Sequence, residues 1–396
     1  MRKNIIPSLV AVALAGCLGS APTGTGQPGG NPGGNNPGPG NGNNPAPAPG
    51  PSTPAEDPAL AARTVDYGQA LRTAAIKLTG DLPTMTEIAG VTDATSYGAQ
   101  VDKYLADPRF ARQLILYFRD LMKLGGTKAF ETAPTFAAEL VVNDRPITDL
   151  FTATTNTCPT FDATMGKFTD ASCTPANGAA TVGVLTDPGA MQQFYSNMAF
   201  RRVRWVQESF VCTKFPAEYS ANPVTKGNGQ YVSPWPFTSI TGGTDKTIAP
   251  INFQDTSSVV CANCHTTMNH IAPLFANFDM NGAYQTTIQV HTPTPMAPIT
   301  KLSDWLPMGE TLSWRYQQPV TDLTSLGAAM AKDPDVADCQ VARAWNWAMS
   351  KTDIVGDLAT VPTSVIQTYE TQLAGNGYKL KPVLRAMFTS DDFVKF

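Results

Sequence analysis

The sequence predicts an all-α fold with long loops, and three observations lead to this prediction. Apolar residues recur at helical spacing in several segments, which begin and end at Asp-Pro, Thr-x-x-Glu and Gly signals. No convincing alternation of apolar and polar residues indicates strands, and no internal repeat is present. Hydrophobic residues make up 42% of the chain and charged residues only 15%, so a sizeable core can form.

Residues 1–16 are expected to be a targeting segment rather than part of the fold. Arg2 and Lys3 form a positive start, and the apolar stretch from Ile5 to Ala15 is too short to span a bilayer permanently. The stretch ends in Leu-Ala-Gly-Cys, which resembles the bacterial lipobox. That resemblance implies a signal peptide removed before Cys17 and a diacylglyceryl group on its thiol. An ordinary secretory signal with an incidental Cys17 is the alternative.

Residues 17–57 are expected to be a lipidated cysteine followed by a disordered tether. Gly and Pro make up more than half of positions 18–54, which contain no charged and no aromatic residue. Such a segment cannot bury enough apolar surface to fold, so it would hold a folded body away from a membrane. We expect that body to consist of an N-terminal helical region at 58–180 and a second helical region at 181–396.

The first helical region begins at Asp57-Pro58, where an N-cap residue precedes proline at the first helical position. Its first apolar stripe is closed by Gly80, and Thr84 with Glu87 forms a capping box for a short second helix. Asp107-Pro108 opens a third helix, whose apolar face runs to Gly125-Gly126. These stripes predict core rather than cofactor contacts.

The second half alternates loops with helices. Residues 153–183 are rich in Thr, Ala and Gly and predict an irregular loop, and helical spacing resumes at Asp187-Pro188. It runs through the basic cluster at 201–204, which we interpret as a solvated face, with pairing to an anionic cofactor group as the alternative. We expect loops at 216–258 and 291–320, and helices near 322–331, 334–350, 362–374 and 381–388.

The strongest chemical signal is the motif Cys261-Ala262-Asn263-Cys264-His265. Two cysteines three positions apart on a helical turn can add to the two vinyl groups of a haem, and the adjacent histidine then reaches the iron. The motif predicts one covalent haem c, with His265 as the proximal iron ligand. Covalent haem attachment takes place outside the cytoplasm, which agrees with the export signal.

Three other interpretations of the motif remain open. A zinc site could combine Cys261, Cys264 and His265 with His270, although the usual separation between two ligand pairs is missing. A thioredoxin-like dithiol would require a βαβ context, which the sequence does not indicate. A structural disulfide across C-x-x-C would be sterically strained.

The remaining cysteines are even in number, which suits an oxidising compartment. If Cys17 carries lipid and the motif takes two, then Cys158, Cys173, Cys212 and Cys339 are left for disulfides. We pair Cys158 with Cys173 because they lie close together in one loop, and Cys212 with Cys339. Four free buried thiols are the alternative.

Residues Cys261 to Tyr284 read C-A-N-C-H-T-T-M-N-H-I-A-P-L-F-A-N-F-D-M-N-G-A-Y. They resemble the haem segment of the planctomycete-type cytochrome c families, whose pattern is roughly C-x-x-C-H-x-x-M-D-P followed by E-N-F-D-x-x-G-x-Y. Similar flanking stretches lie at 143–146, 183–188, 205–212, 339–351 and 377–393. The resemblance covers most of 60–396 and implies a cytochrome c-like haem segment within a larger helical body. These families are largely of unknown function, so the resemblance implies a cofactor and little chemistry.

The segment also departs from that pattern. Asn269-His270 stands where the families have Asp-Pro, and Met280 occupies a position that is usually small. These departures indicate a divergent member whose partner or iron ligation has changed. The run Asp279-x-Asn281-Gly282 contains too few ligand positions for an EF-hand and predicts a turn.

The distal iron ligand is expected from a flexible, Pro-rich loop. The stretch Thr294-Pro295-Met296-Ala297-Pro298 resembles the distal methionine loop of small cytochromes c, so Met296 is the first candidate. Met308 is the second candidate and His291 the third, whereas Met268 and His270 follow the proximal histidine too closely. Met296 as an ordinary packing residue is the alternative.

Three functions are compatible with these features, and we favour a membrane-tethered monohaem electron carrier over a catalyst. A haem oxidoreductase would need an open sixth position and an acid–base group, for which His270 or His291 could serve. A surface binding or structural module stapled by haem is the third possibility. The expected location is the bacterial cell envelope, at the outer membrane or cell surface and facing outside the cytoplasm. Export would remove Arg2 and Lys3 and move the formal charge from −4 to −6, and no basic run is present, which disfavours nucleic acid as a partner.

Overall fold

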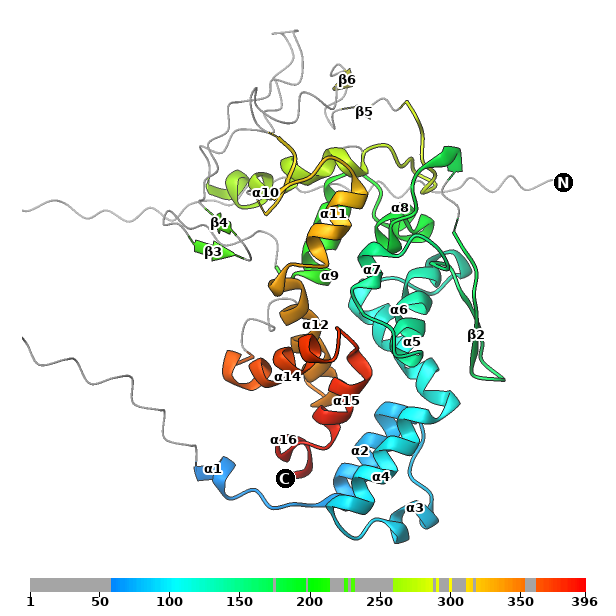
Figure 1. Cartoon of the computed structure of the whole chain (residues 1–396), viewed down its shortest axis with the longest axis vertical. Coiled ribbons are helices and arrows are strands. Elements are labelled where there is room, and N and C mark those ends of the chain that lie inside the picture. The colour runs from blue at the N-terminus through cyan, green and yellow to red at the C-terminus, as the bar shows by residue number, and fades with distance from the viewer. Residues whose placement is uncertain are drawn as a thin grey trace, which may run out of the picture. The chain divides into compact units, whose positions relative to one another are not determined.

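The computed structural model describes residues 58–173, 176–196, 199–213, 224–226, 229–231, 259–287, 290–291, 299–300, 311–315, 318–352 and 361–396. Residues 58–396 form one compact unit in which helices dominate (Figure 1). The predicted all-α class is therefore confirmed at the level of secondary structure. No helix among the described residues has the length and apolar character needed to cross a membrane.

The α-helices are α1 (Pro58–Ala61), α2 (Tyr67–Thr79), α3 (Met85–Gly90), α4 (Ala94–Ala106), α5 (Pro108–Met122), α6 (Thr132–Val142), α7 (Asp149–Thr152), α8 (Pro188–Gln193), α9 (Phe200–Phe210), α10 (Val259–Phe275), α11 (Leu323–Met330), α12 (Pro334–Ala348), α14 (Thr363–Gly375), α15 (Leu380–Phe388) and α16 (Asp391–Val394). Short 3₁₀ turns are η1 (Lys128–Phe130), η2 (Ala176–Gly178) and η3 (Gly183–Thr186). The strands are β1 (Thr160–Asp162), β2 (Lys167–Thr169), β3 (Val224–Lys226), β4 (Gly229–Tyr231), β5 (Val290–His291), β6 (Ile299–Thr300), β7 (Ser313–Trp314) and β8 (Gln318–Pro319).

The first helix is shorter than the sequence predicts. The helix that starts at Pro58 lasts one turn, because the chain then becomes extended and Val65 pairs with Lys395 in an antiparallel bridge. Backbone hydrogen bonds join Thr64 to Phe396 in both directions, at 3.1 and 3.0 Å. A new helix, α2, begins after Asp66, whose side chain accepts from the Gln69 amide, and it ends at the predicted Gly80, which has a φ of 81°.

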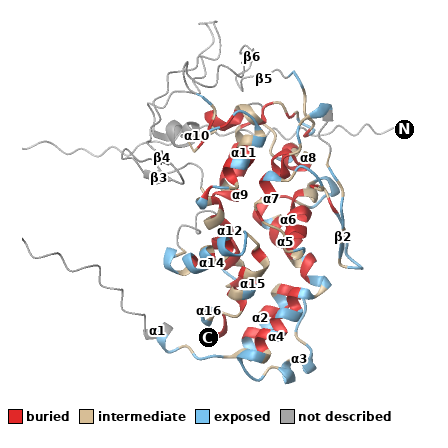
Figure 2. Ribbon diagram, viewed as in Figure 1, coloured by how far each residue is buried: buried red, intermediate tan, exposed pale blue. Residues whose placement is uncertain are grey.

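The amphipathic helix α5 and the buried helix α6 pack together at the centre of the N-terminal part. Helix α5 begins after the predicted Asp107 cap, and the capping box of α3 at Thr84 and Glu87 is also present. Helix α6 is buried along nearly its whole length, from Ala133 to Val141 (Figure 2). The buried apolar residues of both predicted regions belong to one continuous cluster, so a single core extends from α2 to α16.

Short strand pairs are the feature that the sequence did not predict. Four two-stranded antiparallel pairs occur within the described residues: β1 with β2, β3 with β4, β5 with β6, and β7 with β8. The β1–β2 hairpin lies in the predicted irregular loop at 153–183 and pairs Phe161 with Phe168. The strands are too short to show a period of two residues, which is why the sequence gives no signal for them.

The basic cluster on α9 is only partly a solvated face. Arg201 and Arg204 are exposed, and Arg204 pairs with Glu208 one helical turn later at 2.7 Å. Arg202, in contrast, is 0% exposed. The interpretation of the whole cluster as solvated is therefore wrong for Arg202, because its guanidinium is enclosed by backbone carbonyls of other elements.

The four C-terminal helices that the sequence predicts are present as α11, α12, α14 and α15. The first two are capped by Asp322 and Asp333, whose side chains accept backbone N–H groups of the first turn. Asp333 also accepts from the indole of Trp314 at 2.7 Å, and Arg315 pairs with both Asp333 and Asp335. These contacts fix the β7 segment, which packs near α10, against the start of α12.

Candidate functional site

The C-x-x-C-H motif lies in the first half of α10. The backbone of this helix is described throughout, and its side chains are described from Thr267 onward. Positions 264 and 265 follow position 261 by three and four residues. On a continuous α-helix this spacing places all three positions on one face. On a helix, positions at this spacing can serve one common ligand.

The second half of α10 anchors the helix in the core. Asn269 and His270 are each 1% exposed, and Ile271 and Phe275 are buried as well. These positions point in different directions around the helix, so most of this half is covered, while Thr267, Met268, Pro273 and Leu274 stay partly exposed. His270 follows Cys261 by nine positions, about 13 Å along the helix and half a turn away. One zinc ion with bonds of about 2 Å cannot take ligands from both positions, which disfavours the four-residue zinc site.

Arg202 of α9 holds the C-terminal end of α10. Its Nη1 donates to the carbonyls of Phe275 and Phe278, both at 2.8 Å, and its Nη2 donates to the Asp279 carbonyl at 3.0 Å. Its Nε and Nη2 also donate to the carbonyl of Met191 in α8, at 3.0 and 2.6 Å. Burial lowers the pKa of Arg202 to about 10, so the group remains a cation at neutral pH. The cation supplies donors to the Met191 and Phe278 carbonyls, and it adds to the backbone N–H groups of Phe278 and Gly282 that already donate to Phe275 and Asp279.

The segment after α10 is a tight turn, as the sequence predicts. The Asp279 carboxylate accepts backbone N–H groups of Asn281 and Ala283 at 2.8 and 3.0 Å, and its other oxygen accepts from Gln285. A carboxylate used in this way fits a turn rather than a calcium site. A Cβ at Gly282 would lie 2.0 Å from the Pro188 carbonyl, and φ there is +75°, so only glycine fits against α8.

The two aromatic residues of this segment also have structural roles. Phe278 and Tyr284 form an antiparallel bridge, and their rings meet edge to face at 5.4 Å. Asn277 reaches the Tyr284 hydroxyl at 3.3 Å, and Asn177 donates to the Tyr284 carbonyl at 2.6 Å. Several residues that the segment shares with the cytochrome pattern therefore shape the turn that follows the motif helix.

Two disulfides join the cysteine pairs that the sequence predicts. Cys158 and Cys173 have their Cα atoms 5.1 Å apart, and Cys212 and Cys339 have theirs 5.4 Å apart. The second bond ties the end of α9 to α12 across a sequence separation of 127 residues. Cys339 is 3% exposed. The Cys212 Sγ lies against the Cys339 carbonyl, and the Cys339 Sγ lies against the Ser209 carbonyl.

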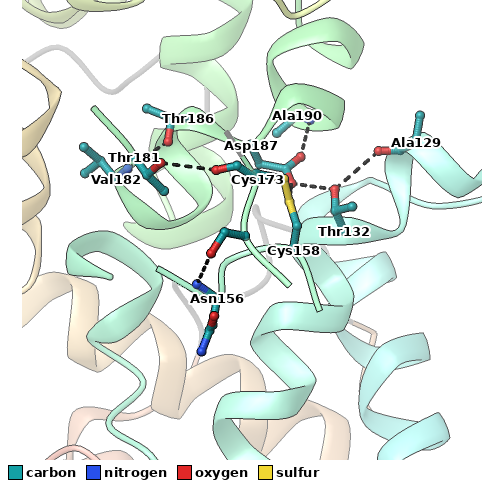
Figure 3. The surroundings of a disulfide bond; sticks show 11 residues. Ala129, Thr132, Asn156, Cys158, Cys173, Thr181, Val182, Thr186, Asp187 and Ala190 are labelled. Atoms are coloured by element: carbon teal, nitrogen blue, oxygen red, sulfur yellow. Dashed lines mark hydrogen bonds between the residues drawn. A yellow bond between two sulfur atoms is a disulfide. The ribbon is translucent and has the colours of Figure 1, made fainter. Parts of the chain in front are cut away.

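The first disulfide lies against a buried carboxyl group (Figure 3). Asp187 is 2% exposed, and its Oδ2 lies 3.9 Å from the Cys158 Sγ. The Thr132 hydroxyl contacts the same oxygen, and the Ala190 amide donates to Oδ1 at 2.8 Å. Burial raises the pKa of Asp187 to about 6, although these hydrogen bonds favour the ionised form.

The two sulfurs and the Asp187 carboxylate all lie within 4.8 Å of one another, the composition of a metal site. While the sulfurs are bonded to each other they are not thiolates, so this cluster cannot ligate a metal in its disulfide form. Sequence reasoning found both cysteines and the Asp187 cap, but not their proximity. No local pattern could report it, because fourteen residues separate Asp187 from Cys173 and the chain doubles back between them.

Other predicted site residues lie wholly or partly outside the described residues. Cys17, Met296 and Met308 lie outside the described residues. His291 belongs to β5, which pairs with β6 through its backbone. No known protein family, no curated protein and no solved structure matches the chain.

Proposed function

We propose that this protein is a membrane-tethered monohaem c-type cytochrome that transfers electrons outside the cytoplasm. The observation that carries the proposal is the C-x-x-C-H motif on α10, with its three positions on one helical face. The lipobox-like sequence ending at Cys17 supports it independently, because haem is attached covalently outside the cytoplasm.

Each chemical role has a named residue. Cys261 and Cys264 would form the thioether bonds, and His265 would ligate the iron. When bound, the haem supplies a one-electron couple, whose potential depends on the axial ligands and on burial. Arg202 and the buried residues in the second half of α10 hold this helix in the core. They therefore position the turn of the helix that carries the motif. Met296 remains our candidate for the distal position, because thioether ligation raises the potential and suits electron transfer.

Haem attachment can be tested in a host that matures c-type cytochromes. The wild type should retain haem on a denaturing gel and after acid–acetone extraction, whereas the pair Cys261→Ala and Cys264→Ala should lose it. The control replaces Cys158 and Cys173, a cysteine pair outside the motif, and should keep the haem. Haem staining that survives loss of Cys261 and Cys264 would contradict the assigned site.

Two further measurements test the ligation and the anchor. Ferric wild type should show the weak long-wavelength charge-transfer band of methionine–histidine haem, and Met296→Ala should lose it. If the band survives, Met308 takes the role, and a high-spin wild type without the band would argue against the electron carrier. Labelled palmitate should enter the wild type but not Cys17→Ser, and equal labelling of both would contradict the lipid anchor.

A further inference from the structure

The surroundings of the Cys158–Cys173 disulfide differ from those of a bond that only staples a fold. A buried carboxyl group contacts one of its sulfurs, as described above, whereas the sulfurs of Cys212 and Cys339 contact backbone carbonyls. We infer that the Cys158–Cys173 disulfide is redox-active: a dithiol reduces it, and Asp187 supplies the proton to the departing Cys158 sulfur. This inference does not depend on the presence of haem.

Opening this disulfide would leave the loop in place. The Cys158 amide donates to the Ala171 carbonyl at 2.9 Å, and the Asn156 amide donates to Ser172 Oγ at 2.9 Å. The Thr181 hydroxyl donates to the Cys173 carbonyl at 3.2 Å, and the β1–β2 hairpin closes the loop between the two cysteines. The two thiols would therefore stay close together, which is the condition for a reversible dithiol–disulfide pair.

The disulfide is also within reach of another molecule. Cys173, the sulfur that would be attacked, is partly exposed, as is Cys212 of the other disulfide, whereas Cys339 is buried. Asp187 contacts Cys158, so Cys158 is the sulfur that can receive a proton as it leaves. Attack on Cys173 is then the productive direction, because it makes Cys158 the leaving group.

The groups around Asp187 allow it to give up and regain a proton. It faces the Thr132 hydroxyl, the backbone N–H groups of Gly189 and Ala190, and the Cys158 sulfur, and no charged side chain of the described residues contributes to its pKa. Thr132 lies within hydrogen-bond distance of both Asp187 and the Ala129 carbonyl, but its hydroxyl has one proton (Figure 3). When Asp187 is neutral it can donate to Thr132, which then donates to Ala129, and when Asp187 is ionised Thr132 donates to it.

The reaction balances with a dithiol as the reductant. One thiolate of the dithiol attacks the Cys173 Sγ, the S–S bond breaks, and its electron pair goes to the Cys158 Sγ, which takes the proton of Asp187. The second thiol of the reductant loses its proton to water and attacks its partner sulfur in the mixed disulfide, releasing Cys173 as a thiolate that water protonates. Asp187 regains a proton from solvent. The cystine gains two electrons and two protons, and the dithiol becomes a disulfide.

The two disulfides of the chain provide an internal reference for the test. The full chain is treated with dithiothreitol between pH 5 and pH 8, quenched by alkylation and mapped by mass spectrometry. Both bonds meet the same thiolate concentration, so the ratio of their reduction rates removes the effect of pH on the reductant. Because positioned acids contribute factors of about 100 or more to proton-transfer steps, the rate for Cys158–Cys173 relative to Cys212–Cys339 should rise at least about tenfold from pH 8 to pH 5.

Asp187→Asn separates proton donation from electrostatics. Asparagine caps the helix equally well and is uncharged, but it cannot act as an acid, so the rate ratio should stay low and flat with pH. Asp187→Ser, a second capping residue, serves the same purpose if the asparagine variant does not fold. A flat ratio in the wild type would overturn the proposal. So would a variant as fast as the wild type at pH 5, because that result would assign the effect to charge alone.

Discussion

Arg202 should be among the side chains on which the stability of this fold depends most strongly. Its guanidinium is fully buried and forms five hydrogen bonds to four carbonyls, those of Met191, Phe275, Phe278 and Asp279. Arg202→Met would fill similar space and leave the Met191 and Phe278 carbonyls without a donor, whereas Phe275 and Asp279 would keep the backbone N–H groups of Phe278 and Gly282. An orphaned buried acceptor costs about 1 to 3 kcal/mol.

The expected loss follows from these contacts. Two orphaned carbonyls give about 2 to 6 kcal/mol, and the lower part of that range applies because the cost of burying the cation disappears with it. Arg202→Lys should lose less, because an ammonium group keeps the charge and has three donors in place of five.

Urea denaturation monitored by circular dichroism measures this loss. The slope increases with protein size and should be about 3 kcal/mol per M or more here, so the midpoint of Arg202→Met should fall by roughly 0.5 M. Arg204→Met, two positions along the same helix, is the matched control, because Arg204 makes only an exposed ion pair with Glu208. That control should lose less than about 1 kcal/mol. Equal midpoints for the two variants would refute the assignment of Arg202 as the group that holds the end of α10.

Three further predictions concern stability. Replacing Cys212 and Cys339 with serine should cost about 5 kcal/mol in the chain-entropy account, given the separation of 127 residues, measured by urea denaturation; no change would show that the bond does not form. Burial raises the pKa of Glu139 to about 7, so its contribution to stability is complete below about pH 4.5 and is lost as the pH rises through 7. Thermal midpoints should therefore fall between pH 5 and pH 8, and by less in Glu139→Gln; an equal fall would exclude this residue as a cause. Gly189→Ala should destabilise by about 2 kcal/mol, since its Cβ would lie 2.0 Å from a carbonyl oxygen of η1, whereas Gly98→Ala, within α4 and free of such a clash, should be neutral or stabilising.

Two of the four Asp-Pro pairs show which features the sequence can predict. Asp107 and Asp187 both precede a proline, and both cap a helix as predicted. Hydrogen bonds from Arg109 lower the pKa of Asp107, whereas burial raises that of Asp187. The local Asp-Pro pattern determines that each aspartate caps a helix. Whether the carboxyl group is buried depends on which distant segments pack against that helix end. The functional environment of Asp187 could not be predicted for that reason.

Helix α6 was missed for a related physical reason. Its residues from Ala133 to Val141 are buried around the whole helix, so they show no polar face and no clear helical period. The burial of Arg202 was missed for the opposite reason, because a charged residue beside two exposed arginines indicates a solvated face. The carbonyls that enclose Arg202 belong to residue 191 and residues 275–279 of other segments. The motif on α10, in contrast, is a local pattern, and the sequence alone located it on a helix.

The short ribbon that pairs residues 64–66 with 394–396 bears on the order in which the molecule can be completed. Residues 64–66 pair with residues that are synthesised more than three hundred positions later. During synthesis from the N-terminus, residues 64–66 have no pairing partner until the C-terminal segment has been made. The early helices therefore pass through a stage in which this backbone pairing is absent. The same proximity makes the chain suitable for circular permutation, since a short peptide could join the two paired ends and new termini could be opened in a distant loop.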